Sequence, residues 1–314
     1  RARTFANNNS STMGAPGAVD AAAEEDPVVA REHRRRLAES EVPWTADPFH
    51  RGELEVQERV GTRRDVHKFA QKIMRKFMPE QHREFFAMLP FVAVGHRDTH
   101  GSVWATVVTG RPGSLLAARD AVTLAFQPDA PVDPALRFAP LKELGLLGIQ
   151  LSTRRRNRLN ATWLAPDVLG VDLSFGNCNQ FIQTREATWG GGGQEHGRHE
   201  NNGDSPGVVV FETLGDAERA LIAAADTFFV ASTGHTDENT QEDDTARRLA
   251  GADVSHRGGN PGFVRVGADG VTLTVPEFPG NLMFNTIGNI LVNPRCGLCF
   301  VDFATSRLLQ LTGT

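Results

Sequence analysis

The segment Ser255-His256-Arg257-Gly258 carries the groups in this sequence that best suit a phosphate. It ends a short stretch typical of a β-strand, and a second glycine, Gly259, follows it. A hydroxyl, an imidazole, a guanidinium and closely spaced backbone N–H groups can all donate hydrogen bonds to phosphate oxygens. The segment is therefore the first candidate for an anion-binding site.

A second group of candidates runs from Val275 and Pro276 through a Pro-Gly turn to Asn281 and Asn285. The pattern predicts a strand end, a turn and then a helix that continues to about Val292. Backbone amides at such a turn and helix start can receive an anion or the polar edge of a ring. We expect this segment to lie beside the first candidate.

Cys296 and Cys299 have the Cys-x-x-Cys spacing but lie on a predicted buried strand without a second pair. Two core cysteines are favoured over a metal site or a redox pair, and we predict no metal. His196 and His199 stand in a Gly-rich loop, where solvated side chains are expected.

An internal repeat positions these candidates, because three segments of the chain recur in the same order. Glycine allows backbone conformations that other residues avoid, and proline fixes φ, so glycines and a proline at matching positions predict a shared shape. The matches are Phe91-Val92-Ala93 with Phe229-Val230-Ala231 at offset 138, Ser102–Leu124 with Gly251–Leu273 at offset 149, and Leu144–Thr162 with Cys296–Thr314 at offset 152.

The two copies differ at the candidate site. Arg257 of the second copy stands opposite Val108 of the first, and Asp253 stands opposite Trp104. We therefore expect one ligand per chain, held by the second copy, with Trp104 filling the matching cavity.

The run Arg154-Arg155-Arg156-Asn157-Arg158 is typical of nucleic-acid binding when it is viewed alone. It aligns with a strand of the second copy in which Arg307 alone keeps the charge. A solvated strand edge is the favoured interpretation. The alternative is that one arginine reaches a ligand across the interface between the copies.

The chain is expected to divide into four parts. Helical spacing predicts a helix, in one piece or two, from near Leu54 to Lys76 and a short one after Pro79, and short β-rich runs begin after Pro90. Copy one continues past Thr162, whereas copy two stops at Thr314, the residue that aligns with Thr162. The expected parts are residues 1–49, a disordered or extended segment; 50–189, the first copy with N-terminal helices; 190–207, a Gly-rich loop; and 208–314, the second copy, truncated at its C-terminus.

Composition limits the possible partners. The 314 residues are 40% hydrophobic and 23% charged, with a formal net charge of −5, so nothing favours nucleic acid or an anionic membrane. No apolar run is long enough to span a bilayer, and three cysteines fit a reducing compartment better than a disulfide framework. We expect a cytoplasmic protein with a small-molecule ligand.

The order of these motifs resembles the pyridoxamine 5'-phosphate oxidase-like, FMN-binding split-barrel family, in its two-copy branch that is sometimes fused to a flavin and iron–sulfur reductase. The similarity covers most of residues 50–314. The segments that carry it are Asp253–Gly262, Pro279-Gly280-Asn281, Asn293-Pro294-Arg295, Val60-Gly61, residues 78–86 and residues 174–178.

The resemblance implies a mainly β fold with flanking helices (α+β), in which two tandem FMN-binding split β-barrels form an intrachain pseudo-dimer. A homodimer and a reductase domain beyond the sequence are further implications. Met283 departs from the family, since many relatives have an arginine there. By position, Ser255, His256, Arg257 and Gly258 would contact the phosphate and ribityl chain, Val275 and Pro276 the ring, and Asn281 and Asn285 the polar end of the flavin.

The function implied is a flavin-dependent oxidoreductase acting on a small-molecule substrate or a reduced nicotinamide, with no catalytic side chain assigned. Two alternatives remain open. One is a non-catalytic flavin carrier, and the other is a split barrel that binds haem or a deazaflavin.

Overall fold

The structure, a computed structural model, describes residues 2–6, 26–44, 47–128, 133, 136–186, 209–236 and 248–314. The Gly-rich segment 190–207, with His196 and His199, lies outside the described residues, as does most of the acidic insert that follows His235.

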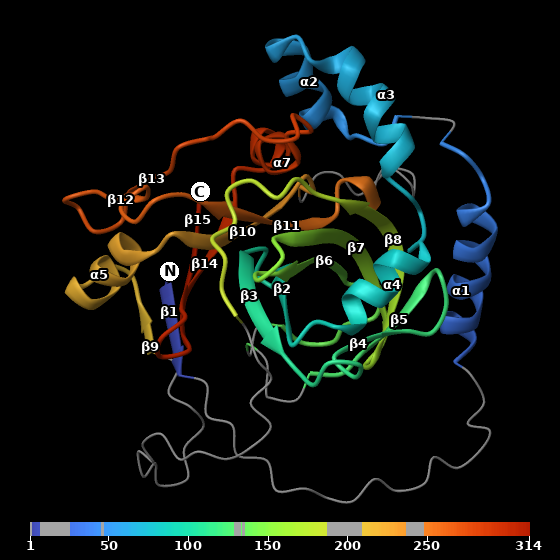
Figure 1. The fold of residues 1–314 in the computed structure, drawn as a ribbon, viewed down its shortest axis with the longest axis horizontal. Coiled ribbons are helices and arrows are strands. Elements are labelled where there is room, and N and C mark those ends of the chain that lie inside the picture. Colours follow the sequence, from blue (N-terminus) through green and yellow to red (C-terminus); the bar gives the residue numbers. More distant parts are fainter. Residues whose placement is uncertain are drawn as a thin grey trace, which may run out of the picture.

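The first sheet is antiparallel and curves around a hydrophobic core (Figure 1). Its strands are β2 (Phe91–Arg97), β3 (Val103–Thr109), β4 (Leu116–Ala118), β5 (Thr123–Phe126), β6 (Glu143–Gln150), β7 (Arg155–Ala165) and β8 (Val168–Gly176). Their order across the sheet is β3-β2-β6-β7-β8-β5-β4.

The second sheet has the order β11-β10-β14-β15-β1-β9, and β12 and β13 form a separate ribbon. The strands are β1 (Ala2–Ala6), β9 (Val209–Phe211), β10 (Thr227–Thr233), β11 (Ala252–Gly258), β12 (Arg265–Val266), β13 (Leu273–Thr274), β14 (Cys296–Asp302) and β15 (Arg307–Gly313). Within the described residues neither sheet closes into a barrel.

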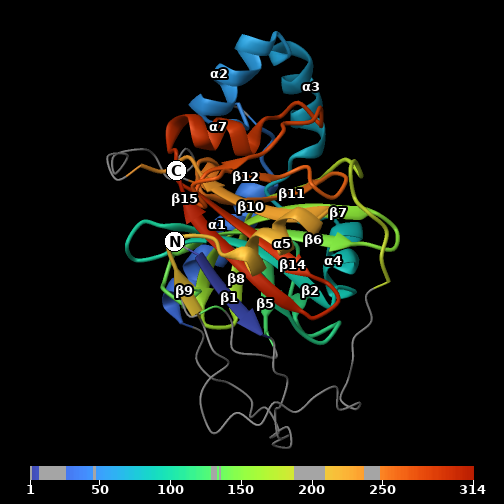
Figure 2. The ribbon, with the colours of Figure 1, turned by 90° about the vertical axis from the view of Figure 1, so that its left-hand side faces the viewer.

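The helices flank the sheets, so the fold is mainly β with α-helices, as the sequence predicts. They are α1 (Pro27–Ser40), α2 (Arg51–Val60), α3 (Arg63–Ile73), α4 (Glu80–Ala87), α5 (Asp216–Ala224) and α7 (Asn285–Val292). Figures 1 and 2 show α2, α3 and α7 together above the sheets. The predicted helix of Leu54–Lys76 is two helices, because Gly61 ends α2 in the left-handed conformation with φ 78°.

Helix α1 lies inside the segment 1–49 that the sequence predicts to be disordered or extended. Asp26 caps its first turn by accepting from the Val28 N–H, and Pro27 stands at the first helical position. The helix is then held by a distant contact, since buried Arg36 donates to Asp172 of β8 over 2.8 Å. A charged segment therefore folds against the first sheet.

Four strands have the same order in both sheets, β3-β2-β6-β7 in one and β11-β10-β14-β15 in the other. Their registers agree as well. Thr109 and Gly258 align at the offset of 149, and their partners on the neighbouring strands are Phe91 and Thr227 respectively. Phe91 thus corresponds to Thr227 and not to Phe229, so the predicted offset of 138 is wrong by two residues. An even shift keeps each side chain on its face of the sheet, which is why the sequence match looked convincing.

The two sheets pack face to face through reciprocal close contacts. A Cβ atom on Gly145 of β6 would lie 2.5 Å from Cα of Asp253, and one on Gly297 of β14 would lie 2.6 Å from Cα of Trp104. Ala93 and Ala105 of the first sheet pack there on residues of the second. Strands β2 and β3 are covered on both faces, which explains their nearly continuous burial.

Candidate functional site

The candidate site is a cavity of about 300 Å³ where the end of β11 meets β7 and the segment that leads into α7. Strand β11 is the edge strand of its sheet, so side chains from both of its faces can reach the cavity. We call this cavity the cationic pocket. Its polar lining consists of Arg156, Arg158, Asn177, Ser255, His256, Arg257, Glu277, Asn281, Asn285 and Thr286.

Arg158 of β7 is buried and crosses from the first sheet to the second. Its Nη1 donates to Oδ2 of Asp253 over 2.9 Å and to Oδ1 of Asn285 over 2.8 Å, and its Nη2 donates to Ser255 Oγ. Its Nε is buried and has no hydrogen-bond partner in the described part of the chain. The guanidinium is thus fixed in direction while part of its donor capacity is unused.

His256 is held by the other arginine of β7, since Nη1 of Arg156 lies 3.1 Å from its Nδ1. A guanidinium can only donate, so Nδ1 accepts and the ring proton resides on Nε2. Burial, and next the charge of Arg156, lower the pKa of His256 to about 3, which keeps the ring neutral near pH 7. Among the described residues nothing accepts from the buried Nε2.

Arg257 completes a group of three guanidinium ions around the pocket. It lies 3.1 Å from Glu277, whose side chain is 44% exposed. Burial, and then the charge of Arg158, lower the pKa of Arg156 to about 10. Such crowding of cations, of which Arg158 is buried and the other two are half-buried, costs free energy that an anion in the pocket would offset.

Helix α2 contacts the lining of the pocket through Glu53, which bonds Asn285. The buried carboxylate accepts from Asn285 Nδ2 and, over 2.9 Å, from the His50 N–H. Asn285 therefore joins Glu53 to Arg158. Burial raises the pKa of Glu53 to about 8.

Asn281 lines the pocket and is fixed by two hydrogen bonds, accepting from the Met283 N–H and donating to Asn177, each over 3.1 Å. Met283 itself is fully buried in the cluster that contains Phe175 and Met74. The position at which the resembled family often has an arginine is thus part of the core of this chain.

Three of the predicted contact residues lie outside the cationic pocket. Gly258 is covered, since a Cβ there would lie 2.1 Å from the carbonyl oxygen of Phe181. Val275 lines the neighbouring cleft, and Pro276 lines neither cavity. The structure brings together Ser255, His256, Arg257, Asn281 and Asn285.

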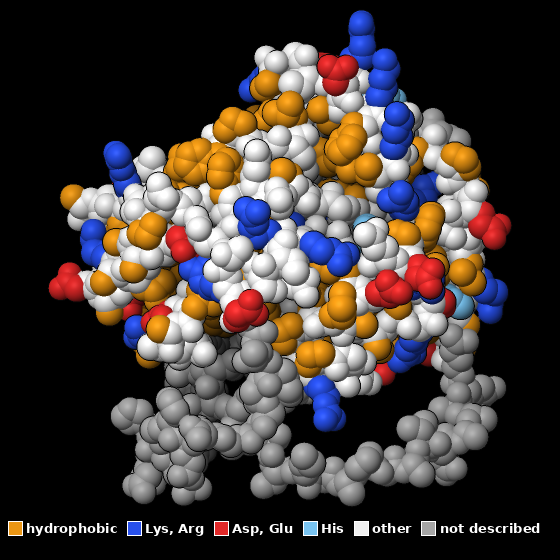
Figure 3. Space-filling model, viewed as in Figure 1, with side chains coloured by type: hydrophobic (Ala, Val, Ile, Leu, Met, Phe, Trp, Pro, Cys, Tyr) orange, Lys and Arg blue, Asp and Glu red, His pale blue; other side chains and the backbone are white. Residues whose placement is uncertain are grey.

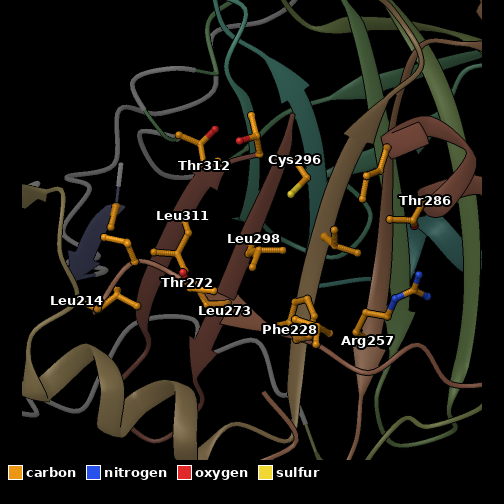
Figure 4. Close-up of a pocket in the computed structure, with 18 of the residues that line it drawn as sticks. Leu214, Phe228, Arg257, Thr272, Leu273, Thr286, Cys296, Leu298, Leu311 and Thr312 are labelled. Atoms are coloured by element: carbon orange, nitrogen blue, oxygen red, sulfur yellow. The ribbon is translucent and has the colours of Figure 1, made fainter. Parts of the chain in front are cut away.

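A second cavity, of about 600 Å³, adjoins the pocket and is shown in Figure 4. We call it the apolar cleft; its walls include Phe228, Val230, Leu273, Leu298 and Leu311. It shares Arg257, Glu277 and Thr286 with the cationic pocket. An elongated ligand with one anionic end and one apolar end could therefore occupy both.

The place in the first sheet that aligns with the cationic pocket is occupied by side chains. Trp104 is buried there, and the guanidinium of Arg3 lies 3.8 Å from the centroid of its ring. Gln310 of β15 lies at the position that aligns with Arg158 of β7. Val108, opposite Arg257, is 2% exposed. The asymmetry expected from the sequence is present in the structure.

Sequence reasoning gave Arg156 and Arg158 only as an alternative, yet both line the pocket. The signal was their spacing, because residues two apart on a strand face the same side. Arg155, the residue before them, is exposed. The solvated-edge interpretation therefore holds for Arg155 and is wrong for Arg156 and Arg158.

Cys299 is fully buried and Cys296 partly so, and burial raises the pKa of both thiols. Three residues apart on β14, they point to opposite faces. In the described ranges no three His, Cys, Asp or Glu side chains gather closely enough to hold a metal ion.

Comparisons of the chain with protein families, curated proteins and solved structures found no match. No described helix has both the length and the apolar character needed to cross a membrane. On the face drawn in Figure 3, hydrophobic side chains gather over α2 and α7, above basic side chains nearer the centre. Inference about function therefore depends on the cationic pocket and the cleft beside it.

Proposed function

We propose that the chain binds FMN with its phosphate in the cationic pocket and acts as a flavin-dependent oxidoreductase. The observation that carries the proposal is the convergence of Arg156, Arg158 and Arg257 from two sheets on one small cavity. Among the described residues Asp253 pairs with Arg158 and Glu277 with Arg257, which leaves an excess of positive charge that a phosphate dianion would offset.

The unused donors of the pocket suit phosphate oxygens. Nε of Arg156, Nε of Arg158 and Nε2 of His256 are all buried without a partner in the described structure. Buried polar atoms are normally hydrogen-bonded, so several such donors on residues that line one cavity favour an acceptor bound nearby. Ser255 adds a hydroxyl at the same place.

The apolar cleft suits the rest of a flavin. A ligand whose phosphate meets Arg257 can extend past Glu277 and Thr286, which both cavities share, toward Val275. When bound, the flavin supplies hydride or electron transfer. The chain's own residues bind the phosphate, orient the ring system and exclude water from its buried side.

The two-barrel architecture is part of the proposal. The shared strand order, the shared registers and the reciprocal contacts of Gly145 and Gly297 support an internal pseudo-dimer of split barrels. Strand β1 adds to this, since it pairs antiparallel with β15 as β8 pairs with β7. The ligand would then lie between the two copies.

The absorption spectrum of the purified protein tests the proposal. A flavin spectrum with releasable FMN is expected, whereas a haem or deazaflavin spectrum would contradict it. Turnover of a reduced nicotinamide with oxygen then separates an oxidoreductase from a flavin carrier.

A further inference from the structure

Two buried carboxyl groups, Glu53 and Asp253, are joined behind the cationic pocket by a chain of hydrogen bonds. Glu53 accepts from Nδ2 of Asn285, and Oδ1 of Asn285 accepts from Arg158 over 2.8 Å. The same Nη1 of Arg158 donates to Asp253 over 2.9 Å. One guanidinium therefore connects both acids to the wall of the pocket.

Neither acid is accessible to solvent, since Glu53 is 4% exposed and Asp253 is also 4% exposed. Oδ1 of Asp253 has no hydrogen-bond partner among the described residues, so it offers a place for a proton. Two buried carboxylates that share one cation repel each other, which favours a state in which one of them is protonated.

The charges around Asp253 come from three elements. Arg158 faces it from β7, and Arg257 lies on its own strand. Glu53 lies on α2, and His50, which caps that helix, lies 3.6 Å from Glu53. His50 accepts from the Gly52 N–H at Nδ1 and lies 2.7 Å from Asn289 Oδ1 through Nε2, the pattern of a neutral ring. From β2 and β6 the neighbours are Gly95 and Gly145, which carry no charge.

We propose that Glu53 and Asp253 share a proton and that binding of an anion in the cationic pocket draws one proton from solvent onto this pair. The inference rests on the proposed function, because it needs the phosphate of FMN beside Arg158. An anion there adds negative charge near both acids and weakens the hold of Arg158 on them. The proton leaves the buffer and forms an O–H bond on a carboxyl oxygen, and no other covalent bond changes.

The sign of the coupling follows from linkage. A ligand that raises the proton affinity of the pair binds most tightly when the pair is already protonated. Burial raises the pKa of Glu53 to about 8 in the ligand-free protein. The affinity for FMN is therefore expected to fall, by at most about tenfold per pH unit, as the pH rises above about 8.

Calorimetric titration with FMN at pH 8.5, in two buffers of different ionisation enthalpy, counts the protons taken up. At this pH the phosphate, with a second pKa of about 6, contributes almost none. We expect uptake of up to about three quarters of a proton in the wild type, because a group with a pKa of about 8 is already about one quarter protonated at this pH. Glu55→Gln, which changes an exposed acid on the same helix, should behave like the wild type. Glu53→Gln and Asp253→Asn should each bind FMN with little or no uptake.

Binding without proton uptake in the wild type would overturn the inference and leave the proposed function standing. Equal uptake in the wild type and both variants would also overturn it, since another group would then carry the proton. Failure of the wild type to bind either FMN or inorganic phosphate would overturn both proposals. The number of protons taken up by the wild type is enough to reject the inference, so the test remains valid even if one variant fails to fold.

Discussion

The guanidinium of Arg257 stands at the boundary of the cationic pocket and the apolar cleft. Arg257→Ala is expected to weaken FMN binding at least tenfold, because a hydrogen bond to a charged group contributes about 1.5–3 kcal/mol and about 1.4 kcal/mol corresponds to tenfold. The side chain is 26% exposed, so its removal should not unfold the protein. Flavin fluorescence quenching measures the change. Arg155→Ala, on the exposed side of β7, is the control. An equal loss of FMN affinity in this variant would show that the net positive charge, and not the position of Arg257, determines binding.

Glu53 links stability to pH. Its pKa in the folded protein is about 8, above the value of 4.5 for an unperturbed glutamate, so the folded state binds this proton more tightly. Its contribution is complete below pH 4.5 and is lost as the pH rises through 8, on the order of a few kcal/mol. Urea denaturation should show that the free energy of unfolding falls less between pH 5 and pH 8.5 in Glu53→Gln than in the wild type. Equal falls would contradict this.

The sequence could identify one side of the site and not the other. Ser255, His256 and Arg257 form a continuous motif, so their backbone positions are close whatever the fold, although His256 points to the other face of β11. Arg156 and Arg158 reach the same pocket only because β7 of one sheet crosses the end of β11 of the other. A contact across about one hundred residues leaves little trace in local spacing. Glu53 was missed for the same reason.

At the scale of elements, the packing of β14 on β3 depends on Gly297. A Cβ there would lie 2.6 Å from backbone atoms of Val103 and Trp104, which cannot move aside as a flexible side chain could. Gly297→Ala is therefore expected to lower the free energy of unfolding by about 2 kcal/mol or more. Gly313→Ala is the matched control on β15, because a Cβ there has nothing within 4 Å. Similar urea midpoints for both variants would disprove the close packing of the sheets.

Strands were easier to predict than their register. Short β-rich runs separated by turn residues located the β-rich region. The match of Phe91-Val92-Ala93 to Phe229-Val230-Ala231, however, lies two residues from the true equivalents. A strand has a period of two, so the shift changed no buried face and the sequence held nothing to reveal it. Helix α1 was missed in part because the Arg36–Asp172 contact that anchors it is distant in sequence.

At the scale of the whole molecule, the proposed duplication implies two pseudo-equivalent places for a ligand, one of which is occupied by the chain's own side chains. Trp104, covered by Arg3, occupies the first, whereas the second is lined by three arginines. We therefore expect one FMN per chain. Released flavin measured against protein concentration gives the ratio, and a value near two would mean that the first copy also binds.

The central claim, that the cationic pocket holds the phosphate of FMN, is tested most directly by comparing FMN with riboflavin, which lacks the phosphate. Equilibrium titration of the flavin-free protein should show FMN binding at least about a hundredfold more tightly, or about 2.7 kcal/mol. In Arg156→Ala this preference should shrink at least tenfold, because the variant removes a donor that riboflavin does not use. Arg155→Ala should keep the wild-type preference. Equal affinities of the wild type for FMN and riboflavin would contradict the account.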